Sequence, residues 1–508
     1  MHATNMFLLF ELIPIPFILL FFFLLFLIPF KLLSSTSKTP KNPPPSAQKL
    51  PVIGNLHQIG STLHLSLQAI TQKHGPLVLI HLGSVPVLVV SSAEAAREFL
   101  KTHDLIFSSR PKNYIYDILS FGSKDIGFSP YGEYWRQVKS ITVLHLLSRK
   151  RVQSFRKIRE KETIHMIETI GKSCGSVVDV TQLLFLLTNN LLCQAAIGKS
   201  YGDHLKYLMD LMARSQYLLG AFVVGSYIPW LSWVDRLRGL ERGAKKVAKE
   251  FHELLDVVID EHINNNIKAD ANNGGKNLLD ILLDLQKENT KKFTLDKDTI
   301  KAVIFDVFVA GTDATYASVE WALSELVRQP DLMKKLQTEV TEIARGRSMV
   351  TEDDMHEMPY LKAVIKESLR LHPPVPVLIP HQAREDVNLM GYDIAKGTQV
   401  MVNIWAIARD PLLWEEPEKF NPERFLNSSM DYRGFDFEFL PFGSGRRGCP
   451  GTEFAMAASE VVLANIVLKF DLTMPNEKKP IELDMAGAPG LTVVRKSHLL
   501  LVPSSRLG

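Results

Sequence analysis

The segment from residue 441 to residue 451 combines residue types that together could bind and tune a metal. It surrounds one cysteine, Cys449, with four glycines, two arginines and two prolines. Glycines let backbone N–H groups approach a sulfur, and both metal coordination and the start of a helix lower the pKa of a thiol. A thiolate bound to haem iron donates electron density and favours O–O cleavage, while an arginine can pair with a haem propionate. We therefore predict that Cys449 is the axial ligand of a haem iron.

The other two cysteines, Cys174 and Cys193, stand in no comparable segment. A lone cysteine is most often a small buried hydrophobe, and this interpretation suits both of them. Because no Cys-x-x-Cys spacing occurs, the sequence indicates neither a disulfide framework nor a zinc site, and it fits a reducing compartment.

The glycines around Cys449 also match a different motif. Gly443-x-Gly445-x-x-Gly448 has the spacing of a dinucleotide-binding loop. Such a loop needs a βαβ unit around it and an acidic residue about twenty positions further on. Here the preceding chain is interrupted by prolines, and the helix that follows lies near the C-terminus. We reject a nicotinamide or flavin site and expect electrons to come from a separate protein.

The cysteine segment resembles the ligand signature of the cytochrome P-450 superfamily, F-x-x-G-x-R-x-C-x-G, at Phe442, Gly445, Arg447, Cys449 and Gly451. The resemblance implies a mainly α fold with minor β that binds haem b (iron protoporphyrin IX). It also implies a monooxygenase that uses O₂ and receives electrons from NADPH only indirectly, through NADPH–cytochrome P-450 reductase. Within the superfamily the chain resembles plant A-type enzymes, nearest family seventy-one.

The superfamily's Glu-x-x-Arg motif is not specific by itself, because this spacing occurs at Glu94/Arg97, Glu325/Arg328, Glu342/Arg345 and Glu367/Arg370. Two such residues share a helix face and are most often a solvated pair. The fourth pair alone is followed by Leu-His-Pro-Pro and later by the Phe-Asn-Pro-Glu-Arg-Phe segment that ends at residue 425. The resemblance implies that Glu367, Arg370 and Arg424 form a buried charge network that holds the loop on the haem side.

Further haem contacts are implied by a segment that resembles the superfamily's W-x-x-x-R helix. Trp135 and one of the two cations Arg136 and Lys139 would contact a haem propionate. Lys139 stands where arginine is usual, and lysine keeps the charge but loses the bidentate geometry.

The sequence departs from the superfamily in its oxygen-activation motif, A-G-x-D-T-T, which residues 310 to 315 resemble. The resemblance implies an acid–alcohol pair at Asp313 and position 314, but this chain has Ala314, and Thr315 lies about 100° further round the helix. Three interpretations remain open. Water or a substrate hydroxyl supplies the missing hydrogen bond and oxygenation continues; the oxygenase is poorly coupled and releases peroxide; or the reaction is a non-hydroxylating one, such as isomerisation, a lyase reaction, desaturation, oxidative coupling or C–C cleavage.

Substrate contacts are likewise implied by the resemblance. The superfamily's recognition segments correspond to residues 114–121, 304–310, 375–379 and 491–492, and the candidate contacts are Phe121, Ala310, Val375, Val377, Leu378, Ile379 and Leu491. These residues are apolar and indicate a pocket for a small lipophilic molecule. Plant terpenoids, coumarin-type phenolics and alkaloids all fit this description.

The elements that must position these residues can be read from hydrophobic periodicity. Residues 77–82 and 85–90 flank Gly83-Ser84 and predict a β-hairpin. Most segments between residues 94 and 329 have helical periodicity, and a helix of about thirty residues is expected from 298 to 328, before Pro330. The last long helix is predicted at 453–470, just after Cys449. The sequence thus predicts one mainly α domain with minor β.

The N-terminus predicts a single transmembrane helix. Residues 12–30 are uninterrupted apolar and would rise about 29 Å as a helix, close to the thickness of a hydrocarbon core. Four lysines follow between residues 31 and 49, which predicts that the rest of the protein lies in the cytosol. The resemblance to microsomal members of the superfamily implies that the membrane is that of the endoplasmic reticulum. We expect an anchor at 1–33, a basic proline-rich linker at 34–50 and a haem-binding catalytic domain at 51–508.

Two further expectations concern partners. Residues 222–233, with tryptophans at 230 and 233, are either a second membrane contact or a buried loop between helices. The formal net charge of +3 is small for 508 residues, so no nucleic-acid partner is expected.

Overall fold

The chain divides into two units, Met1–Pro43 and Pro44–Gly508. The computed structural model describes residues 41–200, 205–264, 276–288, 295–477 and 479–506. The predicted membrane helix, the rest of the anchor and most of the linker lie outside the described residues. The architecture below is that of the second unit.

The described part of the chain is mainly α with minor β, as predicted. Its helices are α2 (Leu63–His74), α3 (Ala93–Arg97), α4 (Tyr114–Leu119), α5 (Glu133–Thr142), α6 (Arg149–Ser154), α7 (Arg156–Lys172), α8 (Val180–Ile197), α9 (Leu205–Gly220), α10 (Val224–Tyr227), α11 (Ser232–Leu237), α12 (Leu240–Asn264), α13 (Leu278–Glu288), α14 (Lys297–Arg328), α15 (Pro330–Ala344), α16 (Pro359–Leu371), α17 (Ile404–Ile407), α18 (Glu423–Leu426) and α19 (Thr452–Lys469). Its strands are β1 (Leu77–Leu82), β2 (Val85–Val90), β3 (Val178–Asp179), β4 (His381–Gln382), β5 (Val387–Leu389), β6 (Tyr392–Ile394), β7 (Gln399–Val402), β8 (Phe470–Thr473) and β9 (Leu500–Ser505).

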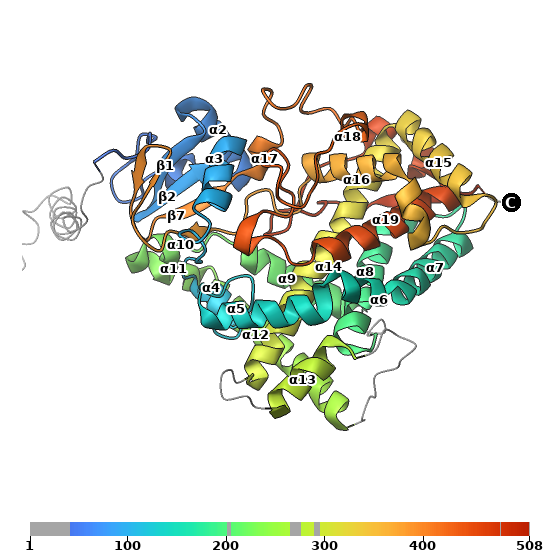
Figure 1. Ribbon diagram of the computed structural model, residues 1–508, viewed down its shortest axis with the longest axis horizontal. Helices are drawn as coiled ribbons and strands as arrows, with labels where there is room; N and C mark the ends of the chain where they lie inside the picture. The colour runs from blue at the N-terminus through green and yellow to red at the C-terminus, as the bar shows by residue number, and fades with distance from the viewer. Residues whose placement is uncertain (1–40, 201–204, 265–275, 289–294, 478, 507–508) are drawn as a thin grey trace, which may run out of the picture. The chain divides into compact units, whose positions relative to one another are not determined.

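The largest sheet has four strands in the order β1-β2-β7-β4. Strands β1 and β2 form the predicted hairpin, with Leu77 opposite Val90, and β7 adds in parallel to β2. Gly83 makes the tight turn with φ +59°, a conformation that costs glycine little. The sheet lies at the opposite end of the body from the long helices α7, α15 and α19 (Figure 1).

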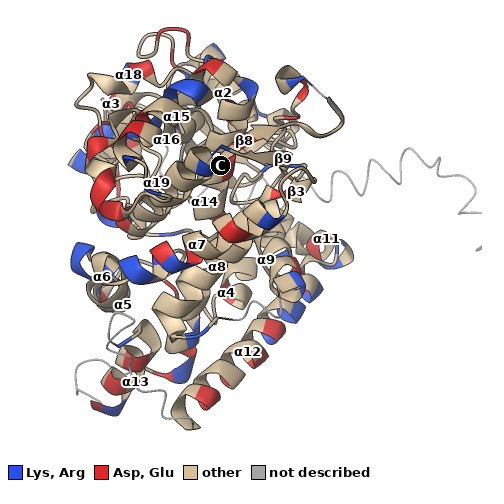
Figure 2. Ribbon diagram, turned by 90° about the vertical axis from the view of Figure 1, so that its right-hand side faces the viewer, with Lys and Arg blue, Asp and Glu red and all other residues tan. Residues whose placement is uncertain are grey.

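Helix α14 is the central helix of the body and packs against α8, α19 and α16. It begins where the Asp296 side chain accepts a hydrogen bond from the N–H of Thr299, and it ends before Pro330. Helices α8 and α14 are both long and apolar enough to cross a membrane, but 78% of each apolar window is buried inside the body. Their apolar composition therefore reflects a position in the core. Helices α12 and α13, in contrast, carry charges of both signs at the surface (Figure 2).

Candidate active site

The segment that carries Cys449 ends directly before helix α19. Its backbone turns through a short 3₁₀ helix at Gly445–Arg447, and the N–H of Cys449 donates to the carbonyl of Phe442 at 2.9 Å. The Thr452 hydroxyl in the first turn of α19 donates to the carbonyl of Cys449 at 3.0 Å. The sequence thus folds here as predicted, with the cysteine fixed next to a helix N-terminus.

The thiol of Cys449 is both accessible and dehydrated. Its side chain is exposed, yet burial raises the pKa of the thiol above its usual range. The N–H of Gly451, the hydroxyl of Thr452 and the charge of Lys139 act in the opposite direction and lower the pKa. Cys449 therefore keeps exposed surface although protein surrounds its thiol, which fits a residue that would hold a bound cofactor.

A cluster of cations surrounds Trp135 close to the cysteine segment. The guanidinium of Arg447 lies 4.2 Å from the centre of the Trp135 ring, and the ammonium of Lys139 lies 5.1 Å from it. Lys139 also donates to the carbonyl of Arg446 at 2.5 Å. Trp135 itself donates to the carbonyl of Ile126 at 2.9 Å. The structure therefore brings Trp135, Lys139 and Arg447 together.

Arg136, the other candidate cation on this helix, lies elsewhere. Its side chain is exposed and forms an ion pair with Glu133. Trp135 and Lys139 are four residues apart and share a helix face, whereas Arg136 points away from that face.

Two residues that the sequence analysis did not single out, Arg110 and His381, belong to the same cluster. Arg110 is buried, and burial together with the charge of Arg447 lowers its pKa. The Nδ1–H of His381 donates to the carbonyl of Phe107 at 2.9 Å. Burial, followed by the charge of Arg110, holds the pKa of His381 well below its usual range. His381 follows the candidate segment 375–379, which was a usable signal, but no local pattern separates Arg110 from the 58 lysines and arginines of the chain.

The electrostatics of this cluster fit a dianionic cofactor. Burial and the neighbouring Arg447 lower the pKa of Lys139 to about 8, and burial lowers that of Arg447 to about 10. Crowded buried cations are costly unless anions compensate them. The one carboxylate that raises the pKa values of Arg110 and Arg447 is Asp125. The two propionates of haem would supply the remaining compensation.

Helix α14 presents an accessible stripe of small residues. Between Thr299 and Val327 the positions that are not buried are Asp306, Ala310, Gly311 and Ala314. Residues 306, 310 and 314 are each four apart and therefore lie on one helix face. A face that carries no bulky side chain beyond residue 310 can approach a flat ring or a bound O₂, which fits the cofactor and the predicted oxygen-activation segment.

Asp313 and Thr315 lie off this stripe. Both side chains are buried, with exposed fractions of 6% and 4%. Burial raises the pKa of Asp313 to about 7, and a hydrogen bond from the amide of Gln216 opposes the shift. Thr315 therefore does not take the place of the missing hydroxyl, and Ala314 is the residue that faces the stripe.

The three residues of the predicted charge network meet below the cysteine side of the body. Glu367 and Arg370 form a bidentate pair, with distances of 2.7 and 2.8 Å, and both side chains are completely buried. Arg424 reaches the same carboxylate at 3.0 Å. Arg370 also donates to the carbonyls of Ala408 and Pro417 at 2.6 and 2.7 Å. The network thus ties helix α16 to the chain that leads to the cysteine segment.

The candidate substrate contacts fall into two groups. Phe121, Ile379 and Leu491 pack at the border of the main helical core and are only partly buried. Val377 and Leu378 pack instead against the two clusters of the sheet region. Val375 and Ala310 also retain exposure, whereas most apolar residues around them are buried. Partial exposure of several apolar residues fits the lining of an internal pocket.

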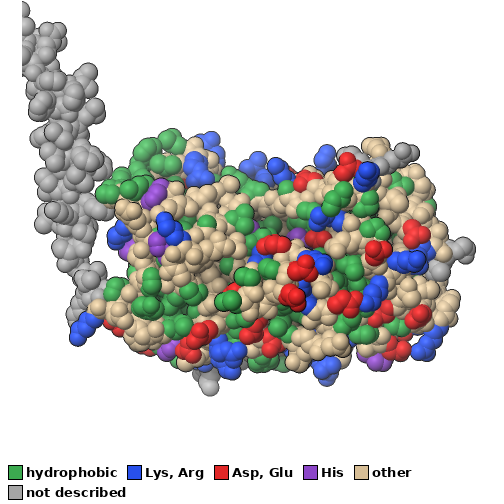
Figure 3. Space-filling model, turned by 90° about the horizontal axis from the view of Figure 1, so that it is seen from above, with side chains coloured by type: hydrophobic (Ala, Val, Ile, Leu, Met, Phe, Trp, Pro, Cys, Tyr) green, Lys and Arg blue, Asp and Glu red, His purple; other side chains and the backbone are tan. Residues whose placement is uncertain are grey.

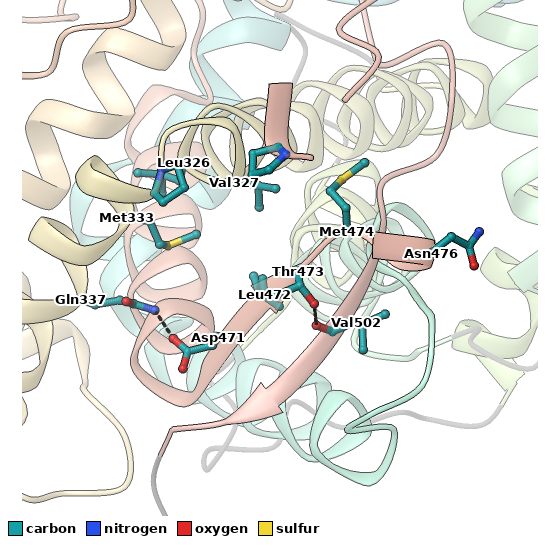
Figure 4. A pocket seen from close by; sticks show the side chains of 12 residues that line it. Leu326, Val327, Met333, Gln337, Asp471, Leu472, Thr473, Met474, Asn476 and Val502 are labelled. Atoms are coloured by element: carbon teal, nitrogen blue, oxygen red, sulfur yellow. Dashed lines mark hydrogen bonds between the residues drawn. The ribbon is translucent and has the colours of Figure 1, made fainter. Parts of the chain in front are cut away.

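A pocket of about 690 Å³ lies at the C-terminal end of α14. Leu326, Val327, Met333, Leu472 and Met474 supply most of its apolar lining, and Gln337 donates to Asp471 at its edge (Figure 4). None of the predicted site residues lines it, so it is separate from the site around Cys449.

Comparisons with known proteins agree with this geometry. The cytochrome P450 family model matches residues 43–502. A 3-beta-hydroxylase of Tanacetum parthenium is 50% identical over 500 residues, which cover 98% of this chain and 99% of that protein. Norfluorocurarine oxidase of a Strychnos species is 50% identical, with 97% of each chain covered. Other plant relatives of similar identity are named in family 71.

Among solved structures, a zebra fish cytochrome P450 with abiraterone has a TM-score of 0.76 and 27% sequence identity. The match covers 88% of this chain and 100% of that chain. The resemblance drawn from the cysteine segment is thereby confirmed, including its plant family. The chain belongs to the cytochrome P450 family of monooxygenases, and it binds haem b and receives electrons from a reductase.

Proposed function

We propose that this enzyme inserts one atom of O₂ into a small lipophilic plant metabolite. The balanced reaction is RH + O₂ + NADPH + H⁺ giving ROH + H₂O + NADP⁺, with electrons passed on by NADPH–cytochrome P-450 reductase. The observation that carries the proposal is the accessible stripe with Ala310 and Ala314 on an otherwise buried helix, together with the exposed Cys449.

Each part of the site has a role in this proposal. Bound haem would supply the oxygen chemistry, and Cys449 would hold its iron. The haem propionates would be held by the cluster of cations and donors around Trp135, because it brings several N–H groups together. Its members are Trp135, Lys139, Arg447, Arg110 and His381. Asp313 would hold and release a proton, since its pKa of about 7 leaves both states populated near neutral pH.

Apolar residues would select the substrate. Phe121, Val375, Ile379 and Leu491 offer partly exposed hydrocarbon and few hydrogen-bonding groups. Such a lining favours a lipophilic molecule over a charged one. The first panel of substrates would therefore contain terpenoids, coumarin-type phenolics and alkaloids, the classes that fit the resemblance to plant enzymes. A plant hydroxylase and a plant oxidase each share half of their residues with this chain.

The enzyme would act at the endoplasmic reticulum membrane, with residues 1–33 as its anchor and the body in the cytosol. Support comes from the body itself, where Trp230, Trp233 and Leu237 are 46%, 53% and 78% exposed. These exposures disfavour the interpretation of residues 222–233 as a buried loop. Hydrophobic side chains gather at the end of the body that holds the sheet, α10 and α11 (Figure 3). Exposed tryptophans beside apolar residues are typical of a membrane interface.

A product screen tests the reaction. Microsomes that contain the enzyme and a plant reductase would receive NADPH, ¹⁸O₂ and a panel of lipophilic plant metabolites, and products would be read by mass. Label in the product, absent with Cys449→Ser, is the expected result. Conversion without label contradicts the proposal.

The alternative is a non-hydroxylating reaction, which one specific observation favours. Ala314, not a hydroxyl residue, occupies the accessible stripe of α14. Unlabelled product that still requires NADPH would indicate desaturation, coupling or C–C cleavage. Unlabelled product without NADPH would indicate an isomerase or lyase.

A further inference from the structure

Gln216 of helix α9 makes a polar contact with the oxygen-activation segment that is unusual in the core. Its side chain is buried, with 7% exposed, and its Nε2 donates to the carbonyl of Val309 at 2.9 Å. Helices α9 and α14 are neighbours in the fold. In a regular helix the carbonyl of residue 309 also accepts the N–H of residue 313, so Gln216 adds a second donor at the turn that carries Asp313.

The same amide acts on the carboxyl of Asp313. Burial raises the pKa of this carboxyl to about 7, and hydrogen bonding from Gln216 works against the shift by favouring the carboxylate. The other titratable group near this carboxyl is Tyr316, whose pKa burial and then Asp313 raise well above its usual range. Gln216 therefore donates to the backbone of this turn from another helix, and its amide also lowers the pKa of the neighbouring Asp313 carboxyl.

The amide of Gln216 is not explained by stability. Its Oε1 is buried and has no hydrogen-bond partner in the described part of the chain. A buried acceptor without a partner costs free energy that an apolar side chain of similar size would not cost. A residue that served only to pack α9 against α14 would be better as leucine or methionine.

The hydroxyl residues near position 314 of α14 do not supply the hydroxyl group that Ala314 lacks. The Oγ1 of Thr312 is buried and has no hydrogen-bond partner among the described residues. Thr315 is buried off the stripe. The hydroxyl of Ser318 is engaged with the carbonyl of Ala314 at 2.8 Å.

We propose that Gln216 is a positioning residue for oxygen activation, and that its amide holds Asp313 and the carbonyl of Val309 in the arrangement that lets this enzyme work with alanine at position 314. The proposal rests on the monooxygenase function proposed above. In this proposal, Gln216 of α9 helps to position the groups for oxygen activation, as a hydroxyl at position 314 of α14, next to Asp313, would otherwise do.

The first test measures the contact without turnover. Infrared pH titration of the holoenzyme, with Asp313→Asn to identify the carboxyl band, would give the protonation of Asp313. Gln216→Leu and Gln216→Met should each shift this titration to higher pH, because the donor that favours the carboxylate is lost. The matched control is Gln337→Leu, which removes an equally buried glutamine that donates to Asp471 at the far end of α14 (Figure 4). An unchanged Asp313 titration in both Gln216 variants would overturn the proposal.

The second test separates positioning from packing. Thermal unfolding of Gln216→Leu should be unchanged or shifted upward, while NADPH consumed per labelled product should rise several-fold, with the excess appearing as H₂O₂ (O₂ + NADPH + H⁺ giving H₂O₂ + NADP⁺). Adding Ala314→Thr to Gln216→Leu should restore most of the coupling. A lower unfolding temperature with unchanged coupling would make Gln216 a packing residue only. If the wild-type enzyme incorporates no label, the monooxygenase proposal fails, while the infrared titration still decides whether Gln216 controls Asp313.

Discussion

Opposing influences act on the thiol of Cys449. Burial raises its pKa, while the N–H of Gly451, the Thr452 hydroxyl and Lys139 lower it. An iron ligand must be deprotonated, so the helix start and the nearby cation stabilise the form that binds. We expect Cys449→Ser to abolish the red-shifted Soret band of the reduced, carbon-monoxide-bound protein, as read by absorption difference spectroscopy.

The control for that measurement is Cys174, which is exposed, so the expectation of a buried cysteine was wrong for Cys174 and is confirmed only for Cys193. Cys174→Ser should leave the band unchanged, because this cysteine is not part of the site. A band that survives Cys449→Ser would show that another residue ligates the iron.

At the residue scale, the sequence predicted site residues that share one motif better than site residues that the fold brings together from distant segments. Cys449 and Arg447 share one segment, so their spacing was visible. The choice of Lys139 over Arg136 was also available, since only a spacing of four places a cation on the face of Trp135. Arg110 and Gln216 act through contacts with distant segments, and nothing local marks them.

Helix α16 and the irregular chain after it depend on one buried carboxylate. Glu367 receives both Arg370 and Arg424, and Arg370 donates in addition to carbonyls at 408 and 417. Because Glu367→Gln leaves the buried guanidinium of Arg370 and the partly buried one of Arg424 without their anion, we expect a loss of about 3–5 kcal/mol in the free energy of unfolding. Urea unfolding followed by circular dichroism would measure it.

The matched control is Glu342→Gln, in another Glu-x-x-Arg pair of the chain. Glu342 is exposed, and its partner by spacing, Arg345, pairs with Glu357. A change within about 0.5 kcal/mol is expected there. Equal losses of unfolding free energy in the two variants would mean that the Glu367 network stabilises the protein no more than an exposed Glu-x-x-Arg pair does.

A second element-scale contact joins the loop after α4 to helix α14. Asp306 accepts the N–H groups of Ile126 and Gly127 at 2.5 and 3.2 Å, and Asp125 accepts that of Phe128 at 2.8 Å. Burial raises the pKa of Asp125 to about 6 and, together with Asp125, raises that of Asp306 well above its usual range. The two carboxyls therefore share protons that the unfolded chain would release.

The sign of the pH dependence follows from that shift. Raised carboxyl pKa values mean that the folded protein binds more protons than the unfolded chain between about pH 4 and pH 6, so the free energy of unfolding falls as pH rises through this window. Asp306→Asn keeps an oxygen that accepts the N–H groups of the loop, and it removes one of the two titrating carboxyls. We expect it to raise the free energy of unfolding above pH 6 and to change it little at pH 4.

Unfolding temperatures at pH 4.5 and pH 7.5 would test this expectation. Asp331→Asn, an exposed acid at the start of α15, is the control and should leave the pH profile unchanged. A profile for Asp306→Asn that parallels the wild type would contradict the shared titration.

Elements were predicted well wherever one local signal set their limits. The hairpin bounds agree with the prediction because Gly83 fixes the turn, and Pro330 ends α14 where expected. The start of α14 is one residue earlier than predicted, since Asp296 caps it. The loop that Asp306 holds is different: its conformation depends on a helix 180 residues away in sequence, which periodicity does not reveal.

At the scale of the whole chain, apolar length alone did not identify membrane segments. Residues 12–30, α8 and α14 are all long apolar stretches, yet α8 and α14 are mostly buried within the body. The lysines that follow residues 12–30 were the signal that distinguished the predicted anchor.

The described body contains its own hydrophobic cores, and the earliest residue of any of them is Ala47. A protein that lacks residues 1–43 should therefore fold, show the same carbon-monoxide band and unfold at the same temperature as the full chain.

Loss of the anchor should weaken sedimentation with phospholipid vesicles without abolishing it, because Trp230 and Trp233 remain exposed. Trp230→Ser with Trp233→Ser in the shortened protein should then abolish binding, because tryptophan side chains favour the membrane–water interface. Leu412→Ser, at a residue that is 91% exposed on a different loop, is the control and should not affect binding. Vesicle binding of the shortened protein that survives loss of both tryptophans would place the membrane contact on another surface of the body.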